Sequence, residues 1–206
     1  MKPGTRALGI AESTDENSGR AVLCGAVVRV DRVVDGVAYA TATVGGLDAT
    51  DAVCALLDRL NREDIQYLLV SGVAPAWFNI LDLDRIAGAA DRPVLSLSYE
   101  ASPGLEPALR EQFAGDALDS RLAVYERLPP RRRLSVNGET LFARSVGLAG
   151  DRVEDEDADV ADEVARIVRA YTPTGGRPEP VRVARLAARA ARQWRERTPA
   201  DSDRHE

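Results

Sequence analysis

A short apolar run in the middle of the chain ends on residues that could do chemistry. Residues 67–70 predict a buried strand that ends at Ser71, and the loop after it carries Trp77 and Asn79. In open α/β sheets, binding and catalytic groups gather where the strands end. A metal-dependent nuclease needs an aspartate at such a place, because converging carboxylates hold the ions that activate water. The serine at this strand end therefore favours a non-catalytic use of the site.

Three carboxylates lie close to other predicted strand ends. Glu12 follows the first predicted strand, Asp48 precedes the first predicted helix, and Asp82 follows the loop after residues 67–70. Each has a simpler explanation, because Glu12 can be a loop charge and aspartates are preferred helix N-caps. A Mg²⁺ site needs only one or two protein carboxylates, since water and substrate phosphates complete its shell. A weak metal site built from these three residues is therefore an alternative interpretation.

Histidine and cysteine narrow the possible chemistry further. The only histidine is His205, in the polar end of the chain. A Ser-His-Asp triad, a Cys-His dyad and a His-rich zinc site are therefore poor interpretations. Cys24 and Cys54 form no CxxC motif, and we interpret them as two buried free thiols.

The loop after residues 67–70 could bind a ligand without catalysing a reaction. Trp77 could stack on an unpaired base, or it could cover the sheet and anchor the loop, and both interpretations stay open. Asn79 is expected to hydrogen-bond the backbone of the loop.

The last predicted helix, residues 181–197, has a basic stripe and an apolar stripe. The basic side chains could contact phosphates, lie in solvent, or pair with the acidic run EDEDAD at 154–159. The basic stripe repeats at helical spacing and consists of Arg182, Arg185, Arg189 and Arg192. The apolar stripe consists of Val183, Leu186, Ala187, Ala190 and Trp194.

Composition places the chain among globular proteins. Its 206 residues are 45% hydrophobic and 29% charged, which suits one sizeable core. No apolar run approaches the ~20 residues of a membrane span, and the first residues do not resemble a signal peptide, so we expect a cytoplasmic protein. The net charge of −6 argues against indiscriminate coating of nucleic acid but allows a local basic groove. We expect one domain over 1–197 and a disordered polar tail at 198–206.

The order of the predicted elements indicates the fold class. Three strands, a helix, a strand, a helix and a strand follow one another, and two of the first three strands form a hairpin. This order is typical of the mixed five-stranded sheet of ribonuclease-H-like α/β proteins, with extra helices at the C-terminal end. In that arrangement the ends of the first and fourth strands lie side by side. The predicted strands span 6–10, 21–30, 37–44, 66–70 and 93–98, and a separate small hairpin is expected at 134–136 and 140–146.

Four sequence blocks together resemble a known family. They are LGIAES, VGGLDAT, VSGVAPAWFNILDLDRI and GRPEPVRVARLAARA, and they run in the family's order over residues 4–192. The chain resembles the archaeal domain of unknown function ninety-nine, which is grouped with endonuclease V. The resemblance implies an endonuclease-V-like core and metal-dependent chemistry on nucleic acid, an activity that for this family is itself inferred from the fold.

The chain departs from the family pattern at the positions that matter most. Relatives read LGIDDS, so Ala11 and Glu12 replace two aspartates. Relatives read LDG at the end of the fourth strand, where this chain has Ser71, and Arg185 replaces a histidine of RVAHLIA. Alanine cannot bind a metal and serine binds Mg²⁺ poorly, so metal affinity should collapse. The positions that match the pattern are Asp48, Asn79 and Arg182.

We therefore expect a non-catalytic or strongly impaired endonuclease-V-like protein that can bind DNA, RNA or a protein partner, and no membrane. We expect no cofactor. An alternative is a nuclease with a rearranged carboxylate site of Glu12, Asp48 and Asp82, which would need Mg²⁺ or Mn²⁺. A further alternative is a structural subunit that assembles through the helix carrying Trp194. The predicted binding residues are Trp77, Asn79, Arg182, Arg185 and Arg189.

Overall fold

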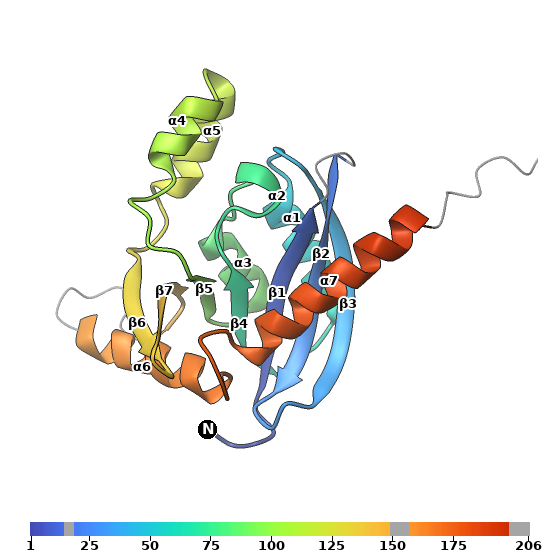
Figure 1. Ribbon diagram of the computed structural model, residues 1–206, viewed down its shortest axis with the longest axis vertical. Helices are drawn as coiled ribbons and strands as arrows, with labels where there is room; N and C mark the ends of the chain where they lie inside the picture. The colour runs from blue at the N-terminus through green and yellow to red at the C-terminus, as the bar shows by residue number, and fades with distance from the viewer. Residues whose placement is uncertain (15–18, 149–156, 198–206) are drawn as a thin grey trace, which may run out of the picture.

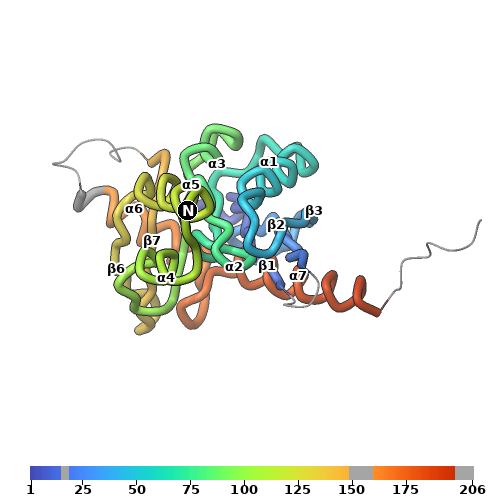
Figure 2. Tube along the Cα trace, turned by 90° about the horizontal axis from the view of Figure 1, so that it is seen from above, coloured from blue at the N-terminus to red at the C-terminus, as the bar shows by residue number. Residues whose placement is uncertain are grey.

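A mixed sheet with helices on both faces forms the centre of the molecule. The computed structural model describes residues 1–14, 19–148 and 157–197, and within these ranges the sheet has seven strands in the order β3-β2-β1-β4-β5-β7-β6. Figure 1 shows α7 crossing one face of the sheet with α1 and α3 behind it, and Figure 2 shows these layers from above.

The strands are β1 (Arg6–Thr14), β2 (Arg20–Arg29), β3 (Val34–Thr43), β4 (Ile65–Ser71), β5 (Val94–Ser98), β6 (Arg132–Val136) and β7 (Glu139–Val146). The helices are α1 (Ala49–Leu60), α2 (Pro75–Phe78), α3 (Leu83–Ala90), α4 (Glu106–Gln112), α5 (Asp116–Tyr125), α6 (Asp157–Ala170) and α7 (Glu179–Arg197).

The central strands pair as the order of elements predicts. β1 runs antiparallel to β2 and parallel to β4, and β4 runs parallel to β5. The register places Ile10 beside Val70, so the carboxyl ends of β1 and β4 lie next to each other. This confirms the expected neighbourhood of the first and fourth strands.

The sheet is larger than the five strands expected from the sequence. β6 and β7 form the predicted hairpin, and its turn at Asn137 and Gly138 has two positive φ angles of 52° and 82°. Those angles match the right-handed twist of two-residue hairpins. The hairpin is not separate, because β7 pairs antiparallel with β5 and extends the sheet. Apolar side chains on both hairpin strands, such as Leu134 and Leu141, supply the buried face that makes this pairing stable.

Alternation along β1 assigns its side chains to two cores. Leu8 and Ile10 pack in the cluster that includes Leu56 of α1. Gly9 faces the opposite side, where a Cβ would lie 2.0 Å from the backbone carbonyl carbon of Pro180. Only glycine permits that approach, so Gly9 sets how closely α7 packs on the sheet.

The buried face of α7 differs from the apolar stripe that the sequence suggested. Ala184 and Ala188 are fully buried against the sheet, whereas Leu186 and Trp194 are 54% and 68% exposed. The close contact at Gly9 explains the difference, because only small side chains fit where the helix backbone meets the strand so closely. The larger apolar residues are therefore turned outward. None of the helices described has the length and hydropathy of a membrane span.

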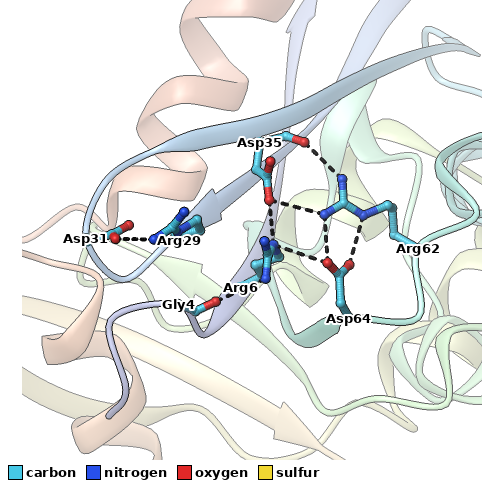
Figure 3. A network of polar contacts seen from close by, with 7 residues as sticks. All are labelled: Gly4, Arg6, Arg29, Asp31, Asp35, Arg62 and Asp64. Atoms are coloured by element: carbon cyan, nitrogen blue, oxygen red, sulfur yellow. Dashed lines mark hydrogen bonds and ion pairs between the residues drawn. The ribbon is translucent and has the colours of Figure 1, made fainter.

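A network of ion pairs closes the end of the sheet where β1 begins (Figure 3). Asp35 accepts hydrogen bonds from Arg6 at 2.5 Å and from Arg62 at 3.2 Å. Arg62 also forms two hydrogen bonds of 2.8 Å with Asp64. These contacts join the start of β1, the β2–β3 turn and the segment between α1 and β4, at the opposite end of β1 from Ala11.

Candidate functional site at the ends of β1 and β4

Ala11 and Ser71 lie side by side near the carboxyl ends of β1 and β4, on the side of the sheet that α7 covers. Ala11 is 4% exposed and packs with Ala26, Val28 and Ala184. Ser71 is the last residue of β4, and by alternation it faces the same side as Leu69, whose cluster includes residues of α6 and α7. These two positions therefore offer a methyl group and a hydroxyl group, and no carboxylate.

Basic groups also lie near Tyr99, which comes directly after β5. Burial raises the pKa of Tyr99, and the nearby charges of Arg177 and Arg185 oppose that rise. The guanidinium of Arg177 lies 4.5 Å from the centre of the Tyr99 ring. These groups favour an anion over a cation at this end of the sheet.

Glu12 points away from these residues. It follows Ile10 by two positions and so faces the α1 side of the sheet, opposite to Ala11. Its carboxylate accepts a hydrogen bond from the Thr14 hydroxyl of the same strand. Glu12 therefore cannot replace the carboxylate that Ala11 lacks.

Asp48 holds a loop together and does not cap α1 with its side chain. Its carboxylate accepts hydrogen bonds from the backbone N–H and hydroxyl of Thr43 at 2.9 and 2.8 Å, and from the Asn79 amide at 2.7 Å. Burial opposes ionisation of Asp48, but these donors outweigh it and lower its pKa. The N-terminal N–H of α1 instead donates to Asn79, from Ala49 at 2.9 Å. The expected side-chain cap by Asp48 is therefore wrong, and Asn79 takes that role.

Asn79 is the central residue of this loop. Its side chain is fully buried, and its amide also donates to the carbonyl of Thr43 at 3.0 Å. The Asn79 side chain thus bonds the backbone of the β3–α1 connection, where the sequence had suggested the backbone of its own loop. Because its three partners lie on the β3–α1 connection, Asn79 fastens the loop after β4 to the loop after β3.

Asp82 has the helix-capping role that the sequence suggested. Its carboxylate accepts from the Arg85 backbone N–H at 3.1 Å and pairs with Arg127 at 3.0 Å. Across the described ranges, no group of three or more His, Cys, Asp or Glu side chains is placed to hold a metal ion. The structure thus gives Glu12, Asp48 and Asp82 separate partners and does not gather them with any other such side chain into a metal site.

The loop after β4 presents Trp77 on a left-handed turn. Ala76, Trp77 and Phe78 have φ angles of 50°, 56° and 58°, which are uncommon for residues with side chains. The Gly45 N–H donates to the Ala76 carbonyl at 2.7 Å, and Arg121 donates to the Phe78 carbonyl at 3.1 Å. The surroundings thus hold a strained turn in place, and Trp77 is left 50% exposed.

Arg121 supports this turn, and no pattern in the sequence indicates that role. It is 3% exposed, donates to the carbonyls of Gly45 and Phe78, and lies 3.8 Å from the centre of the Phe113 ring. Burial lowers its pKa. Its partners lie 43 and 76 positions away in the chain, so only the tertiary structure brings them together.

The basic stripe on α7 is only partly paired. Arg182 pairs with Glu179 at 2.7 Å, and Arg192 contacts Ser13 and Glu196. Arg185 and Arg189 are exposed and form no ion pair within the described part of the chain. The acidic run at 154–159, considered earlier as their partner, lies outside the side chains that the structure describes.

Comparison of sequences identifies the family. The family model for endonuclease dU matches residues 3–192. The chain belongs to the endonuclease dU family. Its relatives include the UPF0215 protein of Pyrobaculum calidifontis, 32% identical over 189 residues that cover 91% of this chain and 97% of the relative. The UPF0215 protein of Thermococcus gammatolerans is 32% identical over 197 residues, covering 92% and 93%. The archaeal resemblance noted in the sequence is confirmed.

Solved structures confirm the fold expected for an endonuclease dU protein. A protein of unknown function from Archaeoglobus fulgidus superposes with a TM-score of 0.74 and 25% identity, covering 90% of this chain and 97% of that one. Endonuclease V of Ciona intestinalis, in complex with a 24mer DNA containing an inosine followed by a ribo-adenosine, gives a TM-score of 0.59 at 13% identity, covering 92% and 86%. The endonuclease dU chain therefore has the ribonuclease-H-like fold of endonuclease V.

Proposed function

We propose that this protein binds nucleic acid through an endonuclease-V-like scaffold and does not cleave it. One observation carries the proposal, namely that Ala11 and Ser71 occupy adjacent strand ends on the side of the sheet that faces α7. Alanine offers no ligand atom, serine offers a neutral one, and Arg185 adds positive charge nearby. These residues do not fit a divalent cation, which prefers several carboxylate oxygens.

The same surroundings support the binding half of the proposal. Arg185 and Arg189 leave cationic heads exposed, and Trp77 offers half of its ring to solvent. Arginine contacts phosphates and tryptophan stacks on unpaired bases. A neighbour with the same fold, the endonuclease V of Ciona intestinalis, is known in complex with DNA. The buried polar contacts of Asn79 keep the Trp77 loop fixed for such a contact.

A cleavage assay beside a binding assay tests both halves. DNA and RNA containing inosine, and DNA containing deoxyuridine, are incubated with the protein and Mg²⁺ or Mn²⁺, and binding is followed by fluorescence anisotropy. We expect salt-dependent binding and no metal-dependent product. Cleavage that Glu12→Gln or Asp48→Asn abolishes would overturn the proposal and establish the rearranged carboxylate site. Absence of binding at low salt would overturn the binding half.

Restoring the two carboxylates gives a sharper prediction. In the double variant Ala11→Asp, Ser71→Asp, two carboxylates would lie at adjacent strand ends. Mn²⁺ should therefore raise the melting temperature of this variant and leave that of the wild type unchanged. Calorimetry with and without Mn²⁺ measures the shift, and Ala11→Asn, Ser71→Asn is the matched control for the added volume. An equal shift in the wild type would show that a metal site exists without these carboxylates.

The proposal includes a cytoplasmic location. Cys24 and Cys54 are free thiols, with Cys24 buried and Cys54 half-buried. Burial raises the pKa of Cys24 to about 12, so this thiol stays protonated. Unpaired thiols are usual in a reducing compartment.

A further inference from the structure

A groove lies between the C-terminal half of α7 and the strands β2 and β3, level with the carboxyl end of β1. Its volume is about 590 Å³. Ala11 pairs with Cys24, and Cys24 pairs with Tyr39. Paired residues lie on the same face of a sheet, so Tyr39 lies on the α7 side, as Ala11 does. α7 packs on β1 and β2, and Figure 1 shows its C-terminal end extending beyond β3. The residues that matter for its chemistry are Tyr39, Thr41, Arg59, Ala190, Trp194 and Arg195.

Two aromatic rings on this groove are unusually exposed. Trp194 of α7 is 68% exposed and Tyr39 of β3 is 42% exposed, and both line the groove. The small side chains of Ala190 and Ala191 line it with them and leave room beside the two rings. An apolar groove lined by aromatic rings favours a planar ligand that can stack.

The charged residues of the groove are all positive. Among the described residues that line it, Arg59 and Arg195 carry charge and no carboxylate is present. Arg59 donates to the Tyr39 carbonyl at 2.6 Å, and Arg20 donates to the Thr41 hydroxyl at 2.5 Å on the same edge. The groove thus presents cations beside stacking surfaces in a protein whose net charge is −6. That combination complements a flat base joined to phosphate.

The same charges disfavour a second copy of this chain as the occupant. Symmetrical pairing through β3 would bring the arginines of one copy against those of the other. The described residues that line the groove include no carboxylate that could separate these like charges, which therefore repel. An anionic partner relieves this repulsion, whereas a copy of the chain adds to it.

We propose that the groove binds an unpaired segment of DNA or RNA, with bases stacked on Trp194 and Tyr39 and phosphates on Arg59 and Arg195. The inference rests on the proposed nucleic-acid binding and assigns it a second contact surface. β3 links the two surfaces, since Thr41 lies in the groove and Gly45, just beyond β3, packs under the Trp77 ring. Thr41 and Gly45 are four residues apart, a separation of at most ~14 Å, so an unpaired strand of several nucleotides could reach both tryptophans.

The chain has two tryptophans, one on each proposed contact surface, so the fluorescence of each surface can be measured separately. In Trp77→Phe the remaining fluorescence comes from Trp194, and in Trp194→Phe it comes from Trp77. Single-stranded and duplex oligonucleotides are titrated into both variants, with anisotropy of a labelled oligonucleotide as an independent measure of binding. We expect the single strand to quench Trp194 emission more strongly than the duplex does.

Replacing Trp194 with alanine tests how much its ring contributes to the affinity for a single strand. Trp194→Ala should weaken single-strand binding about tenfold, because each base–aromatic stack contributes that order of affinity. Leu186→Ala is the matched control, since it removes an exposed apolar side chain of the same helix outside the groove. Both positions are exposed, so neither variant should alter the melting temperature.

The outcomes separate this inference from the proposed function. If anisotropy shows binding while Trp194 emission stays unchanged, and Trp194→Ala binds as tightly as the wild type, the groove is not the binding surface. The proposed nucleic-acid binding would then still stand. No anisotropy change at low salt would overturn both. Trp194 emission that depends on protein concentration without oligonucleotide, together with a dimer mass by sedimentation, would assign the groove to a second copy and overturn the inference.

Discussion

At the scale of single residues, Ala11 and Asn79 show two ways in which the candidate site is held together. Ala11 contributes a methyl group to a small apolar cluster under α7, and apolar packing holds this cluster together. Asn79 keeps a full set of hydrogen bonds between two loops. Loss of a carboxylate from a strand end leaves the fold intact because it removes like-charge repulsion. Loss of a buried amide would leave its donors and acceptors without partners.

Asn79→Ala should therefore destabilise the protein by about 2 kcal/mol or more, because Ala49 N–H, the Thr43 carbonyl and the Asp48 carboxylate lose a buried partner. Urea denaturation measures the change. Asp58→Ala, at an exposed position of α1, is the control and should shift the free energy of unfolding by less than about 0.5 kcal/mol. Equal effects at the two positions would contradict the role assigned to Asn79.

At the scale of elements, two close backbone contacts position the candidate site. The left-handed turn at residues 76–78 is held by donors from the β3–α1 loop and from Arg121 of α5. α7 is placed by the contact between Gly9 and the backbone of Pro180. This contact also sets the rotation of α7, so that Ala184 and Ala188 are buried while Arg185, Arg189 and Trp194 face outward.

Gly9→Ala should destabilise the protein by about 3 kcal/mol or more, since the added methyl group would overlap backbone atoms that cannot rotate away. Gly88→Ala is the matched control. Gly88 lies exposed in α3 with nothing within 4 Å of an added Cβ, so this change should stabilise by about 0.5–1 kcal/mol. Thermal melting of both variants checks the difference, and a neutral Gly9→Ala would refute the close contact.

At the scale of the whole molecule, the ion pairs of Figure 3 tie distant segments together at one end of the sheet. Hydrogen bonds from Arg6 and Arg62 lower the pKa of Asp35, and a hydrogen bond from Arg62 lowers that of Asp64. These carboxylates are more acidic in the folded protein than in the unfolded chain. Their contribution is therefore complete above the unfolded pKa of ~4 and is lost as the pH falls through the lower, folded values.

The double variant Asp35→Asn, Asp64→Asn should show a weaker loss of stability on acidification than the wild type. The two proteins should differ most at pH 6–7 and converge at acidic pH, once the pH falls below the lowered pKa values of the folded carboxylates. Melting temperatures between pH 2 and 7 measure this. High salt should also reduce the difference, because the network is partly exposed. A difference that stays constant with pH would show that the network does not stabilise the fold through charge.

The sequence by itself determined the mixed sheet and the adjacency of the first and fourth strands. These follow from hydrophobic periodicity and element order, which are local properties. That Ala11 and Ser71 stand where a carboxylate is expected is what the family resemblance implies. The tertiary structure alone decided that the β6–β7 hairpin joins the main sheet, and that Asn79 caps α1 where Asp48 was expected to. It also decided which face of α7 is buried. Each depends on contacts between residues far apart in the chain, such as Gly9 with Pro180, and no local pattern encodes those distances.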